Sequence, residues 1–208
     1  MKRPIHIATI ALLTLAPLLA QTPKGWKMRV DRSTAASDPD APGDIKFVTM
    51  GAGFHATNPQ AAVYWNPANT ATGAYTLKGT FTLMKPSGHN NYYGLVLGGS
   101  GLDGPQQSYL YFVVAQNGMW QIKRRDGDAT STVAPRTLNE AVKKPDAGGK
   151  STNALEVRVG ADKTDFVVNG VVVHTAPKSG ATEKTDGIYG IRINHQLEVH
   201  VEGLAVSK

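Results

Sequence analysis

Three titratable side chains near the C-terminus have a spacing that could serve acid–base chemistry. Glu198, His200 and Glu202 alternate with apolar residues, so on an extended chain all three point to the same face. The two glutamate Cα atoms would lie about 13 Å apart, whereas glycoside hydrolysis with retention needs carboxyl groups about 5–5.5 Å apart. The spacing therefore favours a solvent-facing strand whose glutamates pair with Arg158 or Arg192 on a neighbouring strand.

The serines, histidines and cysteines give no pattern of a nucleophile or a metal site. A serine nucleophile needs a histidine base and an acid, and GGSGLDG, residues 98–104, lacks the spacing of a nucleophile elbow. The chain has no cysteine, which excludes thiolate zinc sites and cysteine nucleophiles. The histidines that follow His6 lack short metal-ligand spacing, and we interpret them as surface or satisfied residues: His55, His89, His174, His195 and His200.

An acidic, proline-rich segment is the one candidate for a metal ligand set. Asp38, Asp40 and Asp44 could offer oxygen ligands to calcium. Asp, Pro and Gly are also the residues that form ordinary turns, which explains the segment without an ion. We therefore predict no metal site and no cofactor, with calcium possible but unsupported.

The aromatic residues are the best candidates for binding a ligand. Sugar rings present apolar faces that stack on flat side chains, while their hydroxyl groups need a few fixed polar partners. Trp120 and Arg124 share one face of an expected strand and would form a platform if that face were open. If it were closed, Trp120 would belong to the core. The predicted ligand-binding residues are Trp65, Tyr92, Trp120 and Arg124.

The first twenty residues have the pattern of an export signal. Lys2 and Arg3 precede an apolar run from Ile5 to Ala20. The run is too short for a comfortable membrane span, which needs about 20 residues. We predict a signal peptide over residues 1–20 with cleavage near Ala20, a secreted or periplasmic protein, and no membrane span after cleavage. An uncleaved membrane anchor is the alternative.

The charge of the 208-residue chain is modestly positive, at +6. The basic residues are scattered, and their densest groups are 123–125 and 143–144. A nucleic-acid-binding protein normally shows a basic stripe or a recognised module, so we expect no nucleic-acid partner. An exported protein without cysteines cannot use disulfides, so its core must supply the stability.

Short apolar runs between turn residues predict an all-β protein. The runs are rich in valine, tyrosine, threonine, isoleucine and phenylalanine, which favour strands. Residues 21–45 read as an extended N-terminal arm, residues 46–208 as one antiparallel two-sheet β-sandwich, and residues 136–144 as the only helical turn. The expected strands are 46–50, 61–65, 75–84, 92–99, 108–116, 119–125, 154–160, 165–169, 171–175, 187–193 and 197–206.

One hairpin is marked clearly by DFVVNGVVVH, residues 165–174. Asn169-Gly170 suits the two positive-φ positions of a type I′ turn, whose twist matches that of the flanking strands. Apolar residues occur on both faces near this turn, so we expect the hairpin to be covered on both sides.

The C-terminal half carries the pattern Asn-x-Leu-x-Val, then Val-Asn-Gly, then Gly-x-x-Gly-Ile, in the stretches 153–174 and 186–206. This pattern resembles that of the concanavalin A-like lectin/glucanase superfamily. The nearest relatives by this pattern are laminin-G-like domains and secreted bacterial 3-keto-disaccharide hydrolase domains. The resemblance spans residues 46–208 and implies a jelly roll of two packed antiparallel sheets, one of them concave.

The resemblance implies little about activity, because this fold carries lectins, adhesion modules and glycosidases. The Glu-x-Asp-x-(x)-Glu motif of the retaining glycosidases is absent, and HNNYYGLVLGG, residues 89–99, stands where the keto-disaccharide hydrolases have Asn-Ser-Gly-Ile. We expect an exported module that binds carbohydrate or a glycan without catalysis of its own. The alternatives are a divergent glycoside hydrolase and a protein-interaction or adhesion module.

Overall fold

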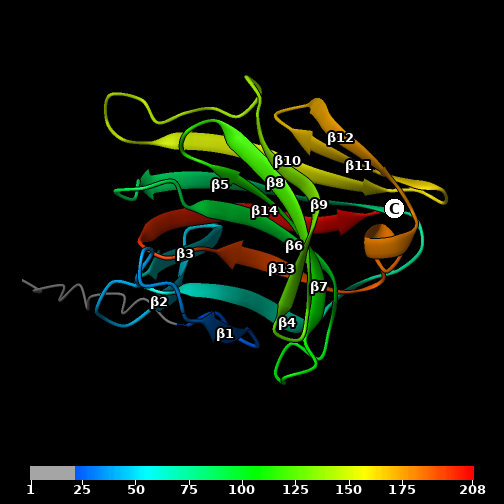
Figure 1. The fold of residues 1–208 in the computed structure, drawn as a ribbon, viewed down its shortest axis with the longest axis horizontal. Helices are drawn as coiled ribbons and strands as arrows, with labels where there is room; N and C mark the ends of the chain where they lie inside the picture. Colours follow the sequence, from blue (N-terminus) through cyan, green and yellow to red (C-terminus); the bar gives the residue numbers. More distant parts are fainter. Residues whose placement is uncertain (1–21) are drawn as a thin grey trace, which may run out of the picture.

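Within residues 22–208, which the computed structural model describes, the chain forms two seven-stranded antiparallel sheets (Figure 1). The first sheet has the order β1 (Lys27–Asp31), β4 (Ala61–Ala71), β13 (Gly187–Ile193), β6 (Tyr92–Ser100), β7 (Ser108–Ala115), β8 (Met119–Asp126) and β9 (Ala129–Leu138). The second sheet has the order β12 (Val171–Pro177), β11 (Lys163–Val168), β10 (Ser151–Val159), β5 (Tyr75–Lys85), β14 (Leu197–Ser207), β3 (Gly53–Asn58) and β2 (Lys46–Met50). The predicted all-β sandwich is confirmed. The expected signal peptide, residues 1–20, lies outside the described residues.

The main core lies between the two sheets and follows from side-chain alternation along each strand. On β10 and β14, the alternate apolar residues are fully or almost fully buried, while the residues between them are more exposed. Aromatic rings from both layers meet in this space, as Phe112 of β7 and Phe166 of β11 do at 5.3 Å between centroids. Apolar burial therefore joins the sheets without a cross-link.

The Asn169-Gly170 turn has the expected backbone. Its two residues have φ angles of 49° and 84°, and Val168 pairs with Val171 across the hairpin. The expectation of cover on both sides holds only in part. Residues 166–168 of β11 are buried, but β12 is the edge strand of the second sheet and leaves Val171 and Val172 exposed.

A hydrogen-bonded pair of asparagines, of which Asn153 is buried, attaches this turn to the rest of the sheet. The Oδ1 atom of Asn153 accepts hydrogen bonds from the backbone N–H of Lys143 at 2.8 Å and from the Asn169 side chain at 2.9 Å. The Asn153 amide donates to the Tyr93 hydroxyl and the Lys143 carbonyl, and Asn169 Oδ1 accepts from the N–H of Ala154. The two asparagines of the Asn-x-Leu-x-Val and Val-Asn-Gly pattern therefore have a structural role here.

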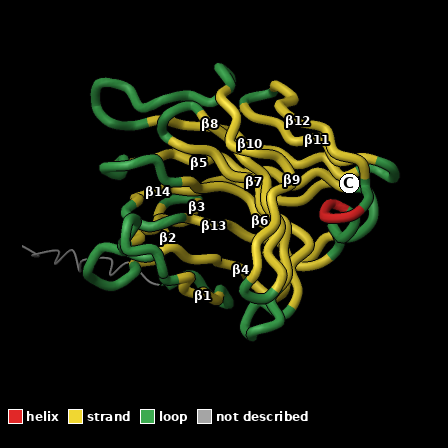
Figure 2. Tube along the Cα trace, in the orientation of Figure 1, coloured by secondary structure: helices red, strands yellow, loops and turns green. Residues whose placement is uncertain are grey.

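Two expectations are corrected by the structure. Residues 27–31 of the expected arm form β1, because they pair with β4 at the edge of the first sheet. Residues 136–138 end strand β9, and Asn139 then forms a tight turn with Ala141, so no helix forms over 136–144. The helical turn of the described residues is instead the 3₁₀ segment η1 (Gly180–Thr182), shown in Figure 2. No helix within residues 22–208 is long and apolar enough to span a membrane.

We expect Asn153→Ala to lower the free energy of unfolding by about 2–3 kcal/mol, because it leaves the Lys143 N–H and the Asn169 amide without their buried partner. Urea unfolding followed by tryptophan fluorescence measures the change. Asn90→Ala, in an exposed loop, is the control and should alter stability by less than about 0.5 kcal/mol. Equal stability of the two variants would contradict the structural role of Asn153.

Candidate functional site

The outer face of the first sheet carries a second apolar cluster, separate from the main core. Strands β4, β6 and β7 have apolar residues at consecutive positions, so one set points to the second sheet and the other points outward. The outward set is nevertheless buried, and it comprises Val63, Trp65, Tyr92, Val96, Leu102, Tyr109, Tyr111, Val113 and Ala115.

The loop between β6 and β7 covers one end of this outer face. Leu102 of the loop belongs to the same cluster as Trp65. The loop is attached to β1 by an ion pair between Lys27 and Asp103 at 2.6 Å and by a hydrogen bond from Arg29 to the Gly104 carbonyl. The sequence predicted a ligand-binding role for Trp65, but its exposed fraction is only 2%, so its ring is not available for stacking.

The other end of the outer face is hollowed into a cavity of about 240 Å³, which we call the outer-face pocket. Strands β6, β7, β8, β9 and β13 contribute to it, together with loops at their ends. Its cations are Lys123, Arg125, Arg136 and Arg192, and Asp38 is the carboxylate among the described residues that line it. The remaining lining residues are Asn90, Asn91, Tyr92, Tyr111, Val113, Gln121, Thr130 and Asn194.

Two arginines of the pocket lie over tyrosine rings. The Arg136 guanidinium carbon is 5.5 Å from the centroid of the Tyr92 ring, and that of Arg192 is 5.2 Å from the Tyr111 centroid. Such cation–π contacts orient the guanidinium groups. The tyrosines are almost fully buried, so the pocket presents the polar arginine groups rather than bare aromatic faces.

One carboxylate holds the deepest cation in place. Asp31 of β1 forms an ion pair with Arg192, which also donates a hydrogen bond to the Tyr109 hydroxyl at 3.0 Å. The side chains of Asp31 and Arg192 are only 9% and 12% exposed, so water screens this pair weakly. Burial also raises the pKa of Tyr109 to about 12, which keeps its hydroxyl neutral.

The surroundings of Lys123 on β8 disfavour its charged form. Burial lowers the pKa of Lys123, and the charges of Arg136, Arg192 and Arg125 lower it further. The four cations together raise the positive potential inside the pocket.

Comparison with known proteins identifies the fold. No family model and no curated protein matches the sequence.

The chain is similar to the solved structure of the carbohydrate-binding module CBM66 from Bacillus subtilis, with a TM-score of 0.62 and 11% identity over 88% of this chain and 96% of that one. It is also similar to a GH16 protein of Bacteroides ovatus in complex with a product (TM-score 0.61, 8% identity, 91% and 97% covered). A Bacillus subtilis protein of unknown function with a galectin-like fold gives a TM-score of 0.58 and 15% identity, with 88% and 89% covered. The chain has the concanavalin A-like sandwich fold.

Identities this low establish the fold of the sandwich and not its activity. The nearer resemblance to laminin-G-like and 3-keto-disaccharide hydrolase domains stays a prediction, because no family model matches.

Within the sandwich, two of the predicted ligand-binding residues point inward. Trp120 is 3% exposed and packs between the sheets, 5.6 Å from the His174 ring. Arg124 lies on the same inner face and donates hydrogen bonds to Ser108 and the Lys184 carbonyl. The expected open platform of Trp120 and Arg124 is therefore not formed. Of the four predicted residues, only Tyr92 lines the outer-face pocket, under Arg136.

Three pocket residues that the sequence analysis did not predict lie on the opposite side of the same strand. Gln121, Lys123 and Arg125 alternate with Trp120 and Arg124 along β8 and point outward into the pocket. The dense basic group at 123–125 was the available signal. The alternation of side chains along the strand could not by itself show which of residues 123–125 faced the core.

The Glu198 motif lies on the other sheet. Glu198, His200 and Glu202 are on the outer face of β14, with Glu198 3.2 Å from His55 and His200 3.4 Å from Glu202. The predicted solvent-facing strand is thus observed, but the predicted partners are wrong. Arg158 pairs with Glu156 and Arg192 with Asp31, because β14 pairs with β5 and β3 rather than with β10 or β13.

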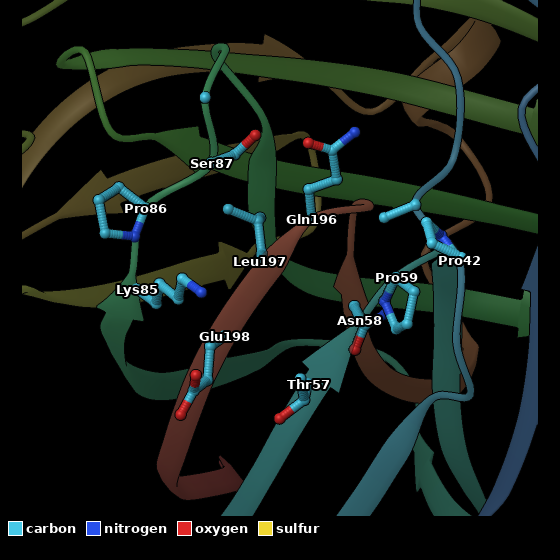
Figure 3. A pocket seen from close by; sticks show the side chains of 12 residues that line it. Pro42, Thr57, Asn58, Pro59, Lys85, Pro86, Ser87, Gln196, Leu197 and Glu198 are labelled. Atoms are coloured by element: carbon cyan, nitrogen blue, oxygen red, sulfur yellow. The ribbon is translucent and has the colours of Figure 1, made fainter.

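Glu198 also borders a cleft of about 390 Å³ at the ends of strands β3, β5 and β14 of the second sheet (Figure 3). The β3–β4 and β13–β14 turns and the segment after β5 form the cleft, and Figure 3 shows Lys85 and Glu198 together on one side. Glu198 is the carboxylate among the described residues that line this cleft. Retaining hydrolysis needs two.

The acidic segment 38–44 lies beside two histidines. Asp38 and Asp40 both lie against His195, which also contacts His89. Asp38, His89 and His195 come from three loops, and among the described residues they form a group whose donor atoms lie close enough together to hold a metal ion.

We expect Asp31→Asn to destabilise the protein by about 3 kcal/mol, because it leaves Arg192 charged and buried without its partner. Chemical denaturation measures the loss. Asp103→Asn removes the partner of an exposed ion pair and should cost less than about 1 kcal/mol. If both variants lose the same stability, the Asp31–Arg192 pair is not the support of the pocket.

Proposed function

We propose that the outer-face pocket binds a carbohydrate that carries a carboxylate group. The observation that supports this most directly is the convergence of Lys123, Arg125, Arg136 and Arg192 on one small cavity. Asp31 compensates one of these charges and Asp38 lies at the edge, so the pocket keeps an excess of positive charge.

The side chains of the pocket suit both parts of such a ligand. An arginine guanidinium can donate two parallel hydrogen bonds to a carboxylate, and its position over a tyrosine ring reduces the freedom that it loses on binding. The amides of Gln121, Asn90 and Asn194 can donate to and accept from sugar hydroxyl groups. Recognition would therefore rest on charge and hydrogen bonds rather than on stacking.

The comparisons support a carbohydrate ligand without deciding it. One similar structure is a carbohydrate-binding module, and another is a GH16 protein with a product bound. We favour binding over hydrolysis, because Asp38 is the one carboxylate among the described residues of the pocket. We further propose that the protein is exported, on the strength of the basic and apolar pattern in residues 1–20.

We expect the protein to bind trigalacturonate but not the neutral trigalactose of the same length. Lys123→Ala and Arg136→Ala should each weaken binding about tenfold or more, because each removes a charge-assisted hydrogen bond. Isothermal titration calorimetry at low salt measures both effects, and higher salt should weaken binding.

Lys78→Ala is the matched control, since Lys78 is an exposed lysine on the second sheet. It should bind as the unmodified protein does. Equal affinity for the neutral sugar would reject the charge-based proposal. Because other acidic sugars share this chemistry, an array of uronate-bearing and neutral glycans is run beside the titration. Absence of binding to every acidic glycan would overturn the proposed function.

We also expect the affinity to fall as the pH rises toward the alkaline range. Only the charged form of Lys123 attracts an anion, and its pKa lies below that of an ordinary lysine. The affinity is therefore highest below this lowered pKa and declines as the pH rises through it. Lys123→Arg should remove the decline, because a guanidinium stays charged. Identical pH profiles for the two proteins would show that Lys123 does not contact the anion.

A further inference from the structure

Three loops bring Asp38, His89 and His195 into one cluster beside the pocket. Asp38 belongs to the β1–β2 loop, His89 to the β5–β6 loop and His195 to the β13–β14 loop. Asp38 Oδ1 lies 2.7 Å from His89 Nε2 and 3.1 Å from His195 Nε2, and the two Nε2 atoms are 3.1 Å apart. Three donor atoms thus form a nearly equilateral triangle.

The hydrogen bonds around His195 determine what its Nε2 atom can do. Asp40 Oδ1 lies 2.9 Å from His195 Nδ1, and a carboxylate only accepts, so Nδ1 carries the ring proton. In the neutral ring, Nε2 then presents a lone pair toward Asp38 Oδ1 and His89 Nε2. Two neutral imidazoles leave at most one ring proton, on His89, among the three atoms of the triangle, and the Asn91 amide lies 3.1 Å from His89 Nε2 as a further donor. A cation bound outside the plane of the triangle could accept a lone pair from each of the three atoms.

Hydrogen bonds with neighbouring groups orient these side chains, as similar hydrogen bonds orient the ligands of metal sites. The contact from Asp40 to the far nitrogen of His195 is the carboxylate–histidine arrangement that orients a metal-binding imidazole. Asp40 is itself fixed by the backbone N–H of Ser33 at 2.9 Å. The Asn91 amide donates to the His195 carbonyl at 2.8 Å, which joins the β5–β6 and β13–β14 loops.

The donor types fit a transition-metal ion better than calcium. Ligand atoms about 2.0–2.1 Å from a tetrahedral ion are about 3.3 Å from one another, so the three atoms, now 2.7–3.1 Å apart, would move slightly apart around such an ion. Calcium takes six to eight oxygen ligands at about 2.3–2.6 Å. Two imidazole nitrogens and one carboxylate oxygen are instead typical ligands of zinc.

We propose that Asp38, His89 and His195 bind one divalent transition-metal ion of the zinc class. The His195 side chain is 6% exposed, while those of His89 and Asp38 are 41% and 49% exposed, so an ion can enter from solvent. Three protein ligands leave a fourth position for water or a ligand oxygen. Asp38 also lines the outer-face pocket, so the ion lies at its rim. The metal proposal does not depend on the carbohydrate proposal.

The test uses tag-free protein treated with a chelator and then titrated with Zn²⁺ alone. Calorimetry should show one equivalent bound, and Zn²⁺ should raise the midpoint of thermal unfolding. His89→Ala and His195→Ala should each weaken binding at least tenfold. Asp40→Asn, which removes a supporting group and no ligand, should weaken it about 10–100-fold. Co²⁺ should give the visible absorption bands of a tetrahedral site.

His174→Ala is the control, because this partly buried histidine lies on β12 and outside the cluster. It should bind Zn²⁺ as the unmodified protein does. His89 is partly exposed, so the chelated His89→Ala protein should keep its midpoint of unfolding and remain a valid test if His195→Ala does not fold.

Four results would overturn the proposal. They are no uptake of Zn²⁺, uptake that survives both histidine substitutions, binding of Ca²⁺ in place of Zn²⁺, and loss of Zn²⁺ binding in the His174 control. Stability that changes with pH but not with Zn²⁺ would show that an extra proton, and not a metal ion, holds the triangle together.

Discussion

The first sheet buries apolar side chains on both of its faces, and the form of the outer-face pocket depends on this. An antiparallel sheet often leaves one face to water. Here the outer face carries Trp65 and Tyr109 among a continuous apolar cluster, covered at one end by the β6–β7 loop. Charges placed on such a face need partners. Arg192 is paired with Asp31, and the rings of two tyrosines support Arg192 and Arg136.

The positive charge of the pocket is difficult to explain as a contribution to stability. Lys123 lies among three arginines, and their repulsion acts against its charged form. Like charges in a half-buried cavity raise the energy of the folded state. A bound anion would relieve that repulsion. The cluster of positive charges therefore indicates the class of ligand better than the buried aromatic residues do. The rings contribute indirectly, by holding guanidinium groups in position.

Loops at one end of the sandwich add a second kind of chemistry to the same region. The β1–β2, β5–β6 and β13–β14 loops meet where Asp38 is both a wall of the pocket and a member of the histidine cluster. The rigid strands determine where each loop begins and ends, so loop residues far apart in sequence are held within hydrogen-bond distance. The hydrogen bond that His195 Nδ1 donates to Asp40 then fixes the ring, and the Asn91 amide fixes the backbone of His195 by donating to its carbonyl.

The sequence by itself determined the elements that depend on local periodicity. Short runs of strand-favouring residues between turns predicted β2, the strands from β4 to β8 and those from β10 to β14, and Asn169-Gly170 predicted its turn, because strand preference and positive φ are properties of neighbouring residues. Strands β1, β3 and β9 were missed, since their apolar patterns are weak and pairing with neighbours stabilises them. Only the tertiary structure decided which face of a strand meets the core. The packing of the two sheets placed Trp120 inside and Lys123 in the pocket. The tertiary structure also brought His89 and His195 together across 106 residues, because sheet order rather than sequence spacing sets the distance between loops.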